Sequence, residues 1–323
     1  MTQYLIRRLL ISIPVLIGIT FIAFVALSLA PGDPVTARID PSLLAQQPPE
    51  WVEQQRKALG LDQPLIVRYV IWLGGTVRGD LGFSIVTRRA IADELAQRLP
   101  ATFQLMGAAL LIGLCVGIPL GILSAVKKYS FADYLLTSLT IAMISTPTFF
   151  LGLGGMYLFG VYLRILPTAD MATLGMPFSI ADRLHHLILP ASILGLSNAA
   201  PLMRYTRAAM LDVLSQNFIR TAHAKGLGER MVILGHVLRN ALLPILTTIG
   251  LMLPEMVAGA VVTEQIFSWP GMGTMAVRAA ADRDPSLLMG VVLVVGLGVL
   301  LSNLVTDIAY AFADPRVRYG STT

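Results

Sequence analysis

Long stretches without a charged residue constrain this 323-residue chain more than any other feature of its sequence. Four of them, 9–32, 99–126, 134–163 and 285–306, exceed the roughly 20 residues that a helix needs to cross a hydrocarbon core about 30 Å thick. Two weaker stretches, 184–203 and 240–263, contain prolines or a glutamate but have similar lengths. The sequence therefore predicts an all-α membrane protein with six transmembrane helices.

Composition supports a lipid bilayer as the surrounding solvent. Charged residues make up 13% of the chain, whereas a typical soluble domain has about 25%. The net charge of +5 does not predict a nucleic-acid partner, because the basic residues are distributed as a topology signal. The single cysteine, Cys115, allows no disulfide within the chain, and we expect it to be a small buried side chain.

Lysine and arginine indicate the orientation, because short cytoplasmic loops are enriched in both. With the N-terminus in the cytoplasm, twelve basic residues lie inside and four lie on short outer links. The inner residues are Arg7, Arg8, Lys127, Lys128, Arg204, Arg207, Arg220, Lys225, Arg230, Arg239, Arg316 and Arg318, and the outer ones are Arg164, Arg183, Arg278 and Arg283. We therefore expect both termini in the cytoplasm.

These assignments divide the chain into four parts. Residues 1–32 form a cytoplasmic tip and a first helix, whose apolar run is longer than the roughly 7–15 residues of a signal-peptide core. Residues 33–98 lie outside, with short amphipathic helices for which Trp51 and Trp72 are candidate interface anchors. Residues 99–312 form a five-helix core with spans at about 101–126, 134–162, 187–203, 241–263 and 286–308, and 313–323 form a cytoplasmic tail.

A polar hairpin at 205–240 interrupts the apolar core. After Leu211, apolar residues at Leu214, Phe218 and Ala222 share one helical face, and glycines at 226 and 228 end the helix. An isolated helix shorter than roughly 12–15 residues is marginal in water, so this one needs a docking surface. From spacing alone, a solvated loop held only by its neighbours remains an equal alternative.

The hairpin sequence "RTAHAKGLGERMVILGHVLRNALLP" resembles the coupling-helix motif of ABC importer permeases, and most closely that of the dipeptide/oligopeptide/nickel group. Further matching stretches run along almost the whole chain: "RRLLISIPVLIGITFIAF", "LAPGDP", "RGDLGFS", "RLPATFQL", "STPTFFLG", "VTEQIFSWPGMG" and "DPRVRYG". Arg220 replaces the leading glutamate of the wider motif and Arg239 a later proline, as is usual in the peptide group. The resemblance implies a type I ABC importer permease fold with a cytoplasmic coupling helix and an external region after the first helix.

The resemblance also implies a function and partners. The chain would be a permease subunit in a bacterial inner membrane, importing di- or oligopeptides, with nickel complexes or glutathione-like solutes as alternatives. Its partners would be a second homologous permease, two ATP-binding cassette ATPases that carry ATP and Mg²⁺, and an external substrate-binding protein. The residues implied in coupling to the ATPase are Arg220, Thr221, Ala222, His223, Ala224, Lys225, Gly226, Leu227, Gly228 and Arg230.

Energy must come from a partner, because the sequence has no Walker A loop. That loop requires a glycine before its lysine, whereas the four lysines follow Arg, Val, Lys and Ala. We therefore expect neither enzyme activity nor a cofactor in this chain. An ATP-independent carrier or channel and an intramembrane hydrolase are the alternative classes, and neither of them needs a docking helix.

Glu255 is the most anomalous polar residue within a predicted span. An ionisable group there costs at least about 2.5–3.5 kcal/mol and usually faces a bundle interior or a water-filled cavity. Glu255 is therefore a candidate for the translocation path, with structural pairing as the alternative. For Glu264 and Asp307, nearer the span ends, we expect structural or gating roles.

Gly113, Gly117 and Gly121 form two overlapping GxxxG steps, which allow close approach of helix backbones in lipid. They predict a packing seam, within the subunit or with a partner, although ordinary glycine enrichment in membrane helices is the alternative. Adjacent His185 and His186 would point about 100° apart on a helix, so no metal site is expected.

Overall fold

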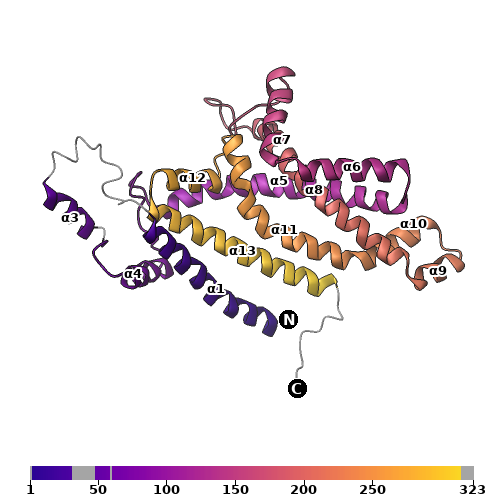
Figure 1. The fold of residues 1–323 in the computed structure, drawn as a ribbon, viewed down its shortest axis with the longest axis horizontal. Helices are drawn as coiled ribbons and strands as arrows, with labels where there is room; N and C mark the ends of the chain where they lie inside the picture. Colours follow the sequence, from indigo (N-terminus) through magenta and orange to yellow (C-terminus); the bar gives the residue numbers. More distant parts are fainter. Residues whose placement is uncertain (1, 31–47, 59, 314–323) are drawn as a thin grey trace. The chain divides into compact units, whose positions relative to one another are not determined.

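The computed structural model describes residues 2–30, 48–58 and 60–313, and these form helices joined by turns (Figure 1). Within the described part, the β-structure is one isolated bridge between Phe83 and Ala90. The chain divides into two compact units, one made of Ala101–Pro270 with Val299–Thr323 and the other of Thr2–Pro100 with Gly271–Gly298. The all-α fold expected from the sequence is therefore confirmed.

The described part of the unit that contains the N-terminal region holds four helices and the beginnings of two more. These are α1 (Thr2–Leu29), α3 (Pro49–Ala58), α4 (Leu65–Val77) and α12 (Met272–Ala281), together with the first parts of α5 (Ile91–Val126) and α13 (Pro285–Ala313). Tyr69 fastens α4 to α1: its hydroxyl donates to the carbonyl of Ile17 and lies 3.0 Å from the Thr20 hydroxyl. Rings of Phe21 and Phe24 meet Tyr69 edge-on, so an aromatic cluster adds to these bonds.

The other unit contains the remaining helices. They are α6 (Phe131–Ser145), α7 (Thr148–Gly155), η2 (Met156–Tyr162), α8 (Ile180–Leu214), α9 (Asn217–Ala224), α10 (Glu229–Met231), η3 (Val232–Val237) and α11 (Leu238–Ile266), where η2 and η3 are π-helices. The long helix α8 packs against α6, α7 and α11 and so forms the centre of this unit. Ser130 and Ser179 cap α6 and α8 by accepting bonds from backbone N–H groups, which the orphan donors of a helix start require.

Five of the described helices are long and apolar enough to cross a membrane, and six spans result if one bent pair counts as a single span. That pair, 131–145 and 148–162, turns by 101° at Thr146–Pro147. Proline lacks an N–H group and disfavours a helical conformation at the residue before it, which explains the break. The sequence predicted a single span over 134–162 with Pro147 as a candidate kink, and the structure shows a sharp break there. The membrane boundaries of all spans stay predictions.

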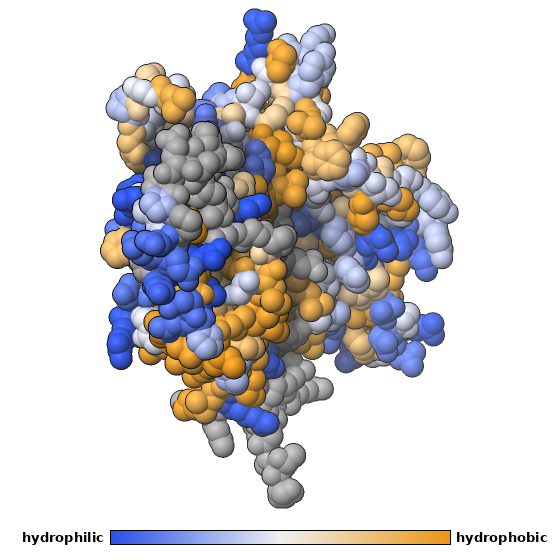
Figure 2. Space-filling view, turned by 60° about the vertical axis from the view of Figure 1, so that its left-hand side comes forward, coloured by the Kyte–Doolittle hydropathy of each residue, from blue (hydrophilic) through white to orange (hydrophobic). Residues whose placement is uncertain are grey.

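Large apolar side chains are exposed on most of the membrane-length helices, as the broad orange areas of Figure 2 show for one face. A water-soluble chain would bury such residues, whereas a helix in lipid does not have to. The sequence predicted that Cys115 is buried, but its side chain on α5 is exposed. Within a lipid-facing helix, an apolar run gives no guide to which side chains face inward.

Candidate functional site

The predicted coupling hairpin is a separate short helix with a glycine turn behind it. Helix α8 ends at Leu214, Gln216 is extended, and α9 then runs over Asn217–Ala224. Gly226 has φ +79°, a left-handed conformation that costs other residues energy, and its N–H bonds to the carbonyl of His223. The chain reverses there and enters α10 at Glu229.

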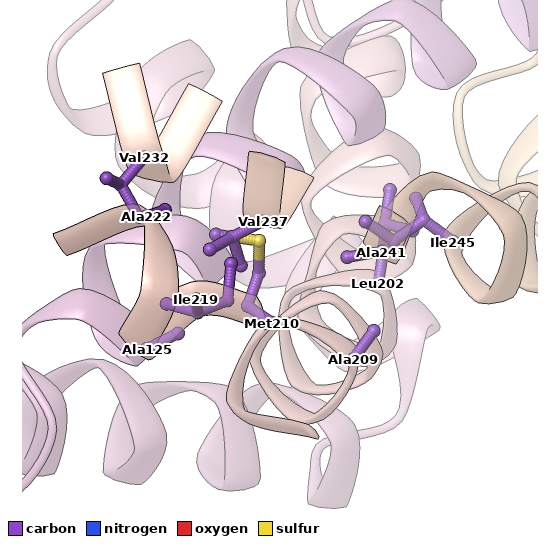
Figure 3. Close-up of a cluster of buried hydrophobic side chains, with 10 residues drawn as sticks. All are labelled: Ala125, Leu202, Ala209, Met210, Ile219, Ala222, Val232, Val237, Ala241 and Ile245. Carbon is purple, nitrogen blue, oxygen red and sulfur yellow. The ribbon is translucent and has the colours of Figure 1, made fainter. Parts of the chain in front are cut away.

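One face of the hairpin is apolar and buried. Ile219 and Ala222 of α9 belong to a cluster with residues of α5, α8, η3 and α11 (Figure 3). In Figure 3, Ala222 lies beside Val232, and Met210 of α8 reaches toward Ile219 and Val237. This cluster holds an eight-residue helix that would be unstable alone. The docking surface that the sequence required is therefore supplied in part by the subunit itself.

The register of the buried face differs from the sequence prediction. The pattern put Phe218 on the buried stripe, yet Phe218 is 45% exposed and Ile219 is 2% exposed. The break at Ser215 and Gln216 resets the helical phase, because α9 does not continue α8. A periodicity counted across that break is therefore wrong at Phe218, although it correctly includes the buried Ala222.

The opposite face of the hairpin is polar and exposed. Of the ten predicted coupling residues, Ala222 is buried, and its side chain belongs to the apolar cluster of the subunit itself. The exposed ones are Arg220, Thr221, His223, Ala224, Lys225, Gly226, Leu227, Gly228 and Arg230. Glu229 lies 3.7 Å from the Nε2 atom of His223. With Arg220, Lys225 and Arg230 beside this single acid, the surface presents a net positive charge suited to an acidic groove.

The return path of the hairpin contains a feature that the sequence did not predict. Val232–Val237 form a π-helix between α10 and α11, with Val232 and Val237 at the ends of its buried side. The backbone hydrogen bonds of a π-helix span one residue more than those of the expected α-helix, and such segments often occur at functional sites. Leucine, valine and isoleucine repeat at spacings that suit either geometry, so the pattern could not distinguish them.

The three glycines of the GxxxG steps face α8 of the same unit. A Cβ atom on Gly117 would lie 2.9 Å from the carbonyl oxygen of Ala199, and one on Gly121 would lie 2.8 Å from that of Met203. Gly113 is less tightly enclosed, with its nearest contact at 3.4 Å from the oxygen of Gly195. The glycines therefore allow α5 and α8 to approach closely within this subunit.

The predicted membrane-embedded acids have different surroundings. The Glu255 side chain lies outside the described residues, and only its backbone, within α11, is described. Glu264 is fully buried and accepts a 2.7 Å bond from the Thr102 hydroxyl, so it joins the end of α11 to α5. Trp269, which follows in the next turn, donates its indole N–H to the carbonyl of Ala101.

His185 and His186 contact different parts of the loop after η2. His185 Nε2 lies 2.9 Å from the carbonyl oxygen of Ile165, and His186 Nδ1 lies 3.0 Å from that of Ala169. Among the described residues, no three His, Cys, Asp or Glu side chains are grouped as a metal site would require. These two histidines thus fasten a loop to α8.

Sequence reasoning missed one polar pair in this unit. Asp133 of α6 and Arg207 of α8 form a two-bond ion pair with the Nε and Nη2 atoms each 2.8 Å from a carboxylate oxygen. Arg207 was counted only as a topology signal. An acid three residues after a capping serine, Ser130, was the available signal, but it indicates a helix start rather than a partner 74 positions away.

The chain matches two family models that together cover most of its length. Residues 117–319 match the model described as "Binding-protein-dependent transport system inner membrane component". Residues 1–106 match the N-terminal model of the same transport-system membrane component.

Similar proteins align with the chain over its whole length. The oligopeptide transport system permease protein AppB of Bacillus subtilis (strain 168) is 44% identical, over 99% of this chain and 100% of AppB. The dipeptide transport system permease protein DppB of Escherichia coli (strain K12) is 37% identical, over 99% of each chain. The glutathione transport system permease protein GsiC of Escherichia coli O6:H1 is 38% identical, over 99% of this chain and 100% of GsiC.

A solved structure of the methionine ABC transporter MetNI, described as inward-facing, has a chain with a similar fold. The TM-score is 0.56 at 14% sequence identity, and the alignment covers 68% of this chain and 96% of that chain. This similarity supports the helical architecture alone.

Proposed function

The chain belongs to the family of binding-protein-dependent transport system inner membrane components and is a permease subunit of an ABC importer, and on that premise we propose that its cargo is di- and oligopeptides. The observation that carries the cargo proposal is the whole-length similarity to an oligopeptide and a dipeptide permease. GsiC, at 38% identity, is named for glutathione, itself a short peptide, so glutathione-like solutes are within the same chemical class. Nickel complexes are the alternative cargo.

An importer of this family works with a binding protein and with ATPase subunits. We propose the finer arrangement of one chain with a second homologous permease, two cytoplasmic ATP-binding cassette ATPases and one external binding protein. ATP and Mg²⁺ would be held by the ATPases, and this chain would have no enzyme activity or cofactor of its own. The distribution of lysine and arginine supports cytoplasmic termini in a bacterial inner membrane.

The coupling hairpin would be the contact with one ATPase. Its exposed face carries Arg220, His223, Lys225 and Arg230, while its buried face is fixed by Ile219 and the cluster around it. A tightly packed buried face and a charged exposed face suit an element that transmits movement, because a force on the exposed face reaches the helices behind it with little local deformation. ATP-driven closure of the two ATPases would then shift the permease between outward-open and inward-open states, through the different contacts made in each.

Glu255 is proposed as a residue of the translocation path, on the ground that an ionisable group within a span usually faces a cavity or the bundle interior. A carboxylate there would attract the amino group of a peptide.

One experiment tests both the cargo and the hairpin. The permease pair, the ATPases and the binding protein are reconstituted in proteoliposomes, and ATP-dependent uptake of a labelled dipeptide and a labelled pentapeptide is measured. Glutathione and Ni²⁺ serve as competitors. Uptake of Ni²⁺ complexes without uptake of either peptide would contradict the cargo proposal.

In the same assay, Gly226→Pro should abolish uptake while the protein still inserts into the membrane. Proline fixes φ near −65°, whereas Gly226 has φ +79° and uses its N–H in a hydrogen bond. The matched control is Gly175→Pro, because Gly175 has the same φ of +79° but lies in the loop after η2. Normal uptake by Gly226→Pro would rule out the coupling role of the hairpin.

A further inference from the structure

The Asp133 carboxylate is one of the most completely bonded side chains in the described structure. It is 2% exposed and accepts two bonds from Arg207, a 2.9 Å bond from the Tyr129 N–H and another from the Ser124 hydroxyl. These donors come from α8, from the turn after α5 and from α5 itself. Because a carboxylate–guanidinium pair with two parallel bonds fixes both distance and angle, α6 and α8 are held in one mutual orientation at this point.

Arg207 lies about two helical turns before the end of the helix that leads into the coupling hairpin. It lies on α8, which ends at Leu214 just before α9 begins at Asn217. Met210, one turn beyond Arg207, belongs to the same buried cluster as Ile219 of the hairpin. A displacement of α9 therefore reaches Arg207 through close-packed side chains, which transmit strain because interiors have low compressibility.

Asp133 stands at the start of the bent helix pair. It lies in the first turn of α6, and α6 leads into the 101° bend and then into α7. Further along, α7 packs closely against two other helices. A Cβ atom added to Gly152 would lie 3.5 Å from the side chain of Ile266 in α11, and one added to Gly155 would lie 3.2 Å from that of Ile193 in α8. The polar attachment at Asp133 thus joins the near end of this pair to the helix that carries the hairpin.

We propose that Asp133 and Arg207 are a positioning pair that carries the displacement of the coupling hairpin from α8 into the bent helices α6 and α7. The proposal rests on the transport function proposed above and assigns a part of its mechanism to residues outside the hairpin. A polar joint with two parallel bonds, unlike the apolar contacts around it, fixes the angle as well as the distance between α6 and α8.

The test separates positioning from stability by removing both charges together. Replacing a buried ion pair by apolar residues of similar volume is often neutral for stability, whereas removing one partner leaves an uncompensated charge. We therefore expect the paired variant Asp133→Leu with Arg207→Met to fold and to assemble with its partners. In proteoliposomes it should hydrolyse ATP, while the peptide uptake per ATP hydrolysed should fall by about tenfold, within the usual range of coupling between sites.

The matched control is Arg204→Met. Arg204 lies one turn before Arg207 on α8, is exposed, and has no ion pair among the residues that the structure describes. It should keep the wild-type ratio of uptake to ATP hydrolysis. If the paired variant assembles and keeps the wild-type ratio as well, the positioning role is refuted.

A second variant covers the case in which the paired replacement does not assemble. Arg207→Lys keeps the charge but cannot form the two parallel bonds, so its uptake per ATP should fall about threefold. An unchanged ratio in that variant refutes the proposal. A wild-type complex that hydrolyses ATP but takes up no peptide contradicts the proposed function itself, and the positioning role with it.

Discussion

Two polar segments of the chain are held in place by opposite means. The tip of the coupling hairpin, 217–230, rests on buried apolar side chains and leaves its charged groups exposed. The segment 82–87 in the other unit is held by polar groups: Ser84 donates a 2.6 Å bond to the Asp284 carboxylate, which also receives the Val86 N–H. A segment fastened by its apolar side keeps its polar side free for a partner, whereas the second segment has used its polar groups internally.

The two anchors also differ in what they make rigid. Asp284 caps the start of α13 by accepting the N–H of Leu287, so one carboxylate fixes a helix end and a distant segment together. Among the described residues, the buried face of the hairpin is held by apolar contacts around Ile219 and Ala222. Directional bonds fix a segment to particular polar partners, whereas close apolar packing holds the hairpin firmly against its neighbours and leaves its own polar groups free.

The largest effect on stability is expected from Asp284→Ala. The substitution removes the fully buried acceptor of the Ser84 hydroxyl and of the Leu287 N–H, whereas the Val86 N–H keeps its 3.2 Å bond to the Ser84 hydroxyl oxygen. The free energy of unfolding should fall by about 4 kcal/mol, which is the sum expected for the lost hydrogen bonds to a buried charge. Thermal unfolding of the purified protein measures this, with exposed Asp62→Ala as the control. A loss below about 1 kcal/mol, the size of a single net hydrogen bond, would show that the segment is not held by this carboxylate.

A smaller effect, confined to the hairpin, is expected from Ile219→Ala. Deleting this buried side chain should cost about 2 kcal/mol, at the low end for isoleucine because the hairpin can relax into the gap. Amide hydrogen exchange should become faster in α9 than in α8. Phe218→Ala is the matched control, since Phe218 is the exposed neighbour. If amide hydrogen exchange in α9 is equally fast in the two variants, Ile219 is not the side chain that holds the hairpin in place.

The smallest effect on stability is expected on the polar front of the hairpin. Arg220→Ala with Lys225→Ala should change the unfolding free energy by less than about 0.5 kcal/mol, because both side chains are exposed. Affinity for the ATPase should nevertheless fall about three- to tenfold, since exposed ion pairs contribute about 0.2–1 kcal/mol each. Binding is measured at low and high salt, because screening should reduce the difference. Lys57→Ala with Arg89→Ala removes the same charge elsewhere and should leave binding unchanged. If both double variants lose the same affinity for the ATPase, the hairpin makes no specific contact with it.

The sequence predicted most of the candidate site but not its internal geometry. It located the hairpin, its end at Gly226 and its exposed basic residues, because glycine and charge have strong local meanings. It put Ala222 on the apolar face, where the structure has it buried, but it chose Phe218 instead of Ile219, because Ser215 and Gln216 carry no strong signal for a break.

By itself, the sequence determined that the chain is helical and membrane-spanning, because uncharged runs of this length have few other stable forms in lipid or water. Only the tertiary structure decided which helices bend and which side chains meet. Pro147 is a local signal for a break, but Pro190 and Pro201 stay inside one helix, so the signal alone does not give the 101° bend. The Asp133–Arg207 pair joins residues 74 positions apart. Local sequence patterns indicate whether a segment lies in lipid or in water. Contacts between segments form only when the chain has packed.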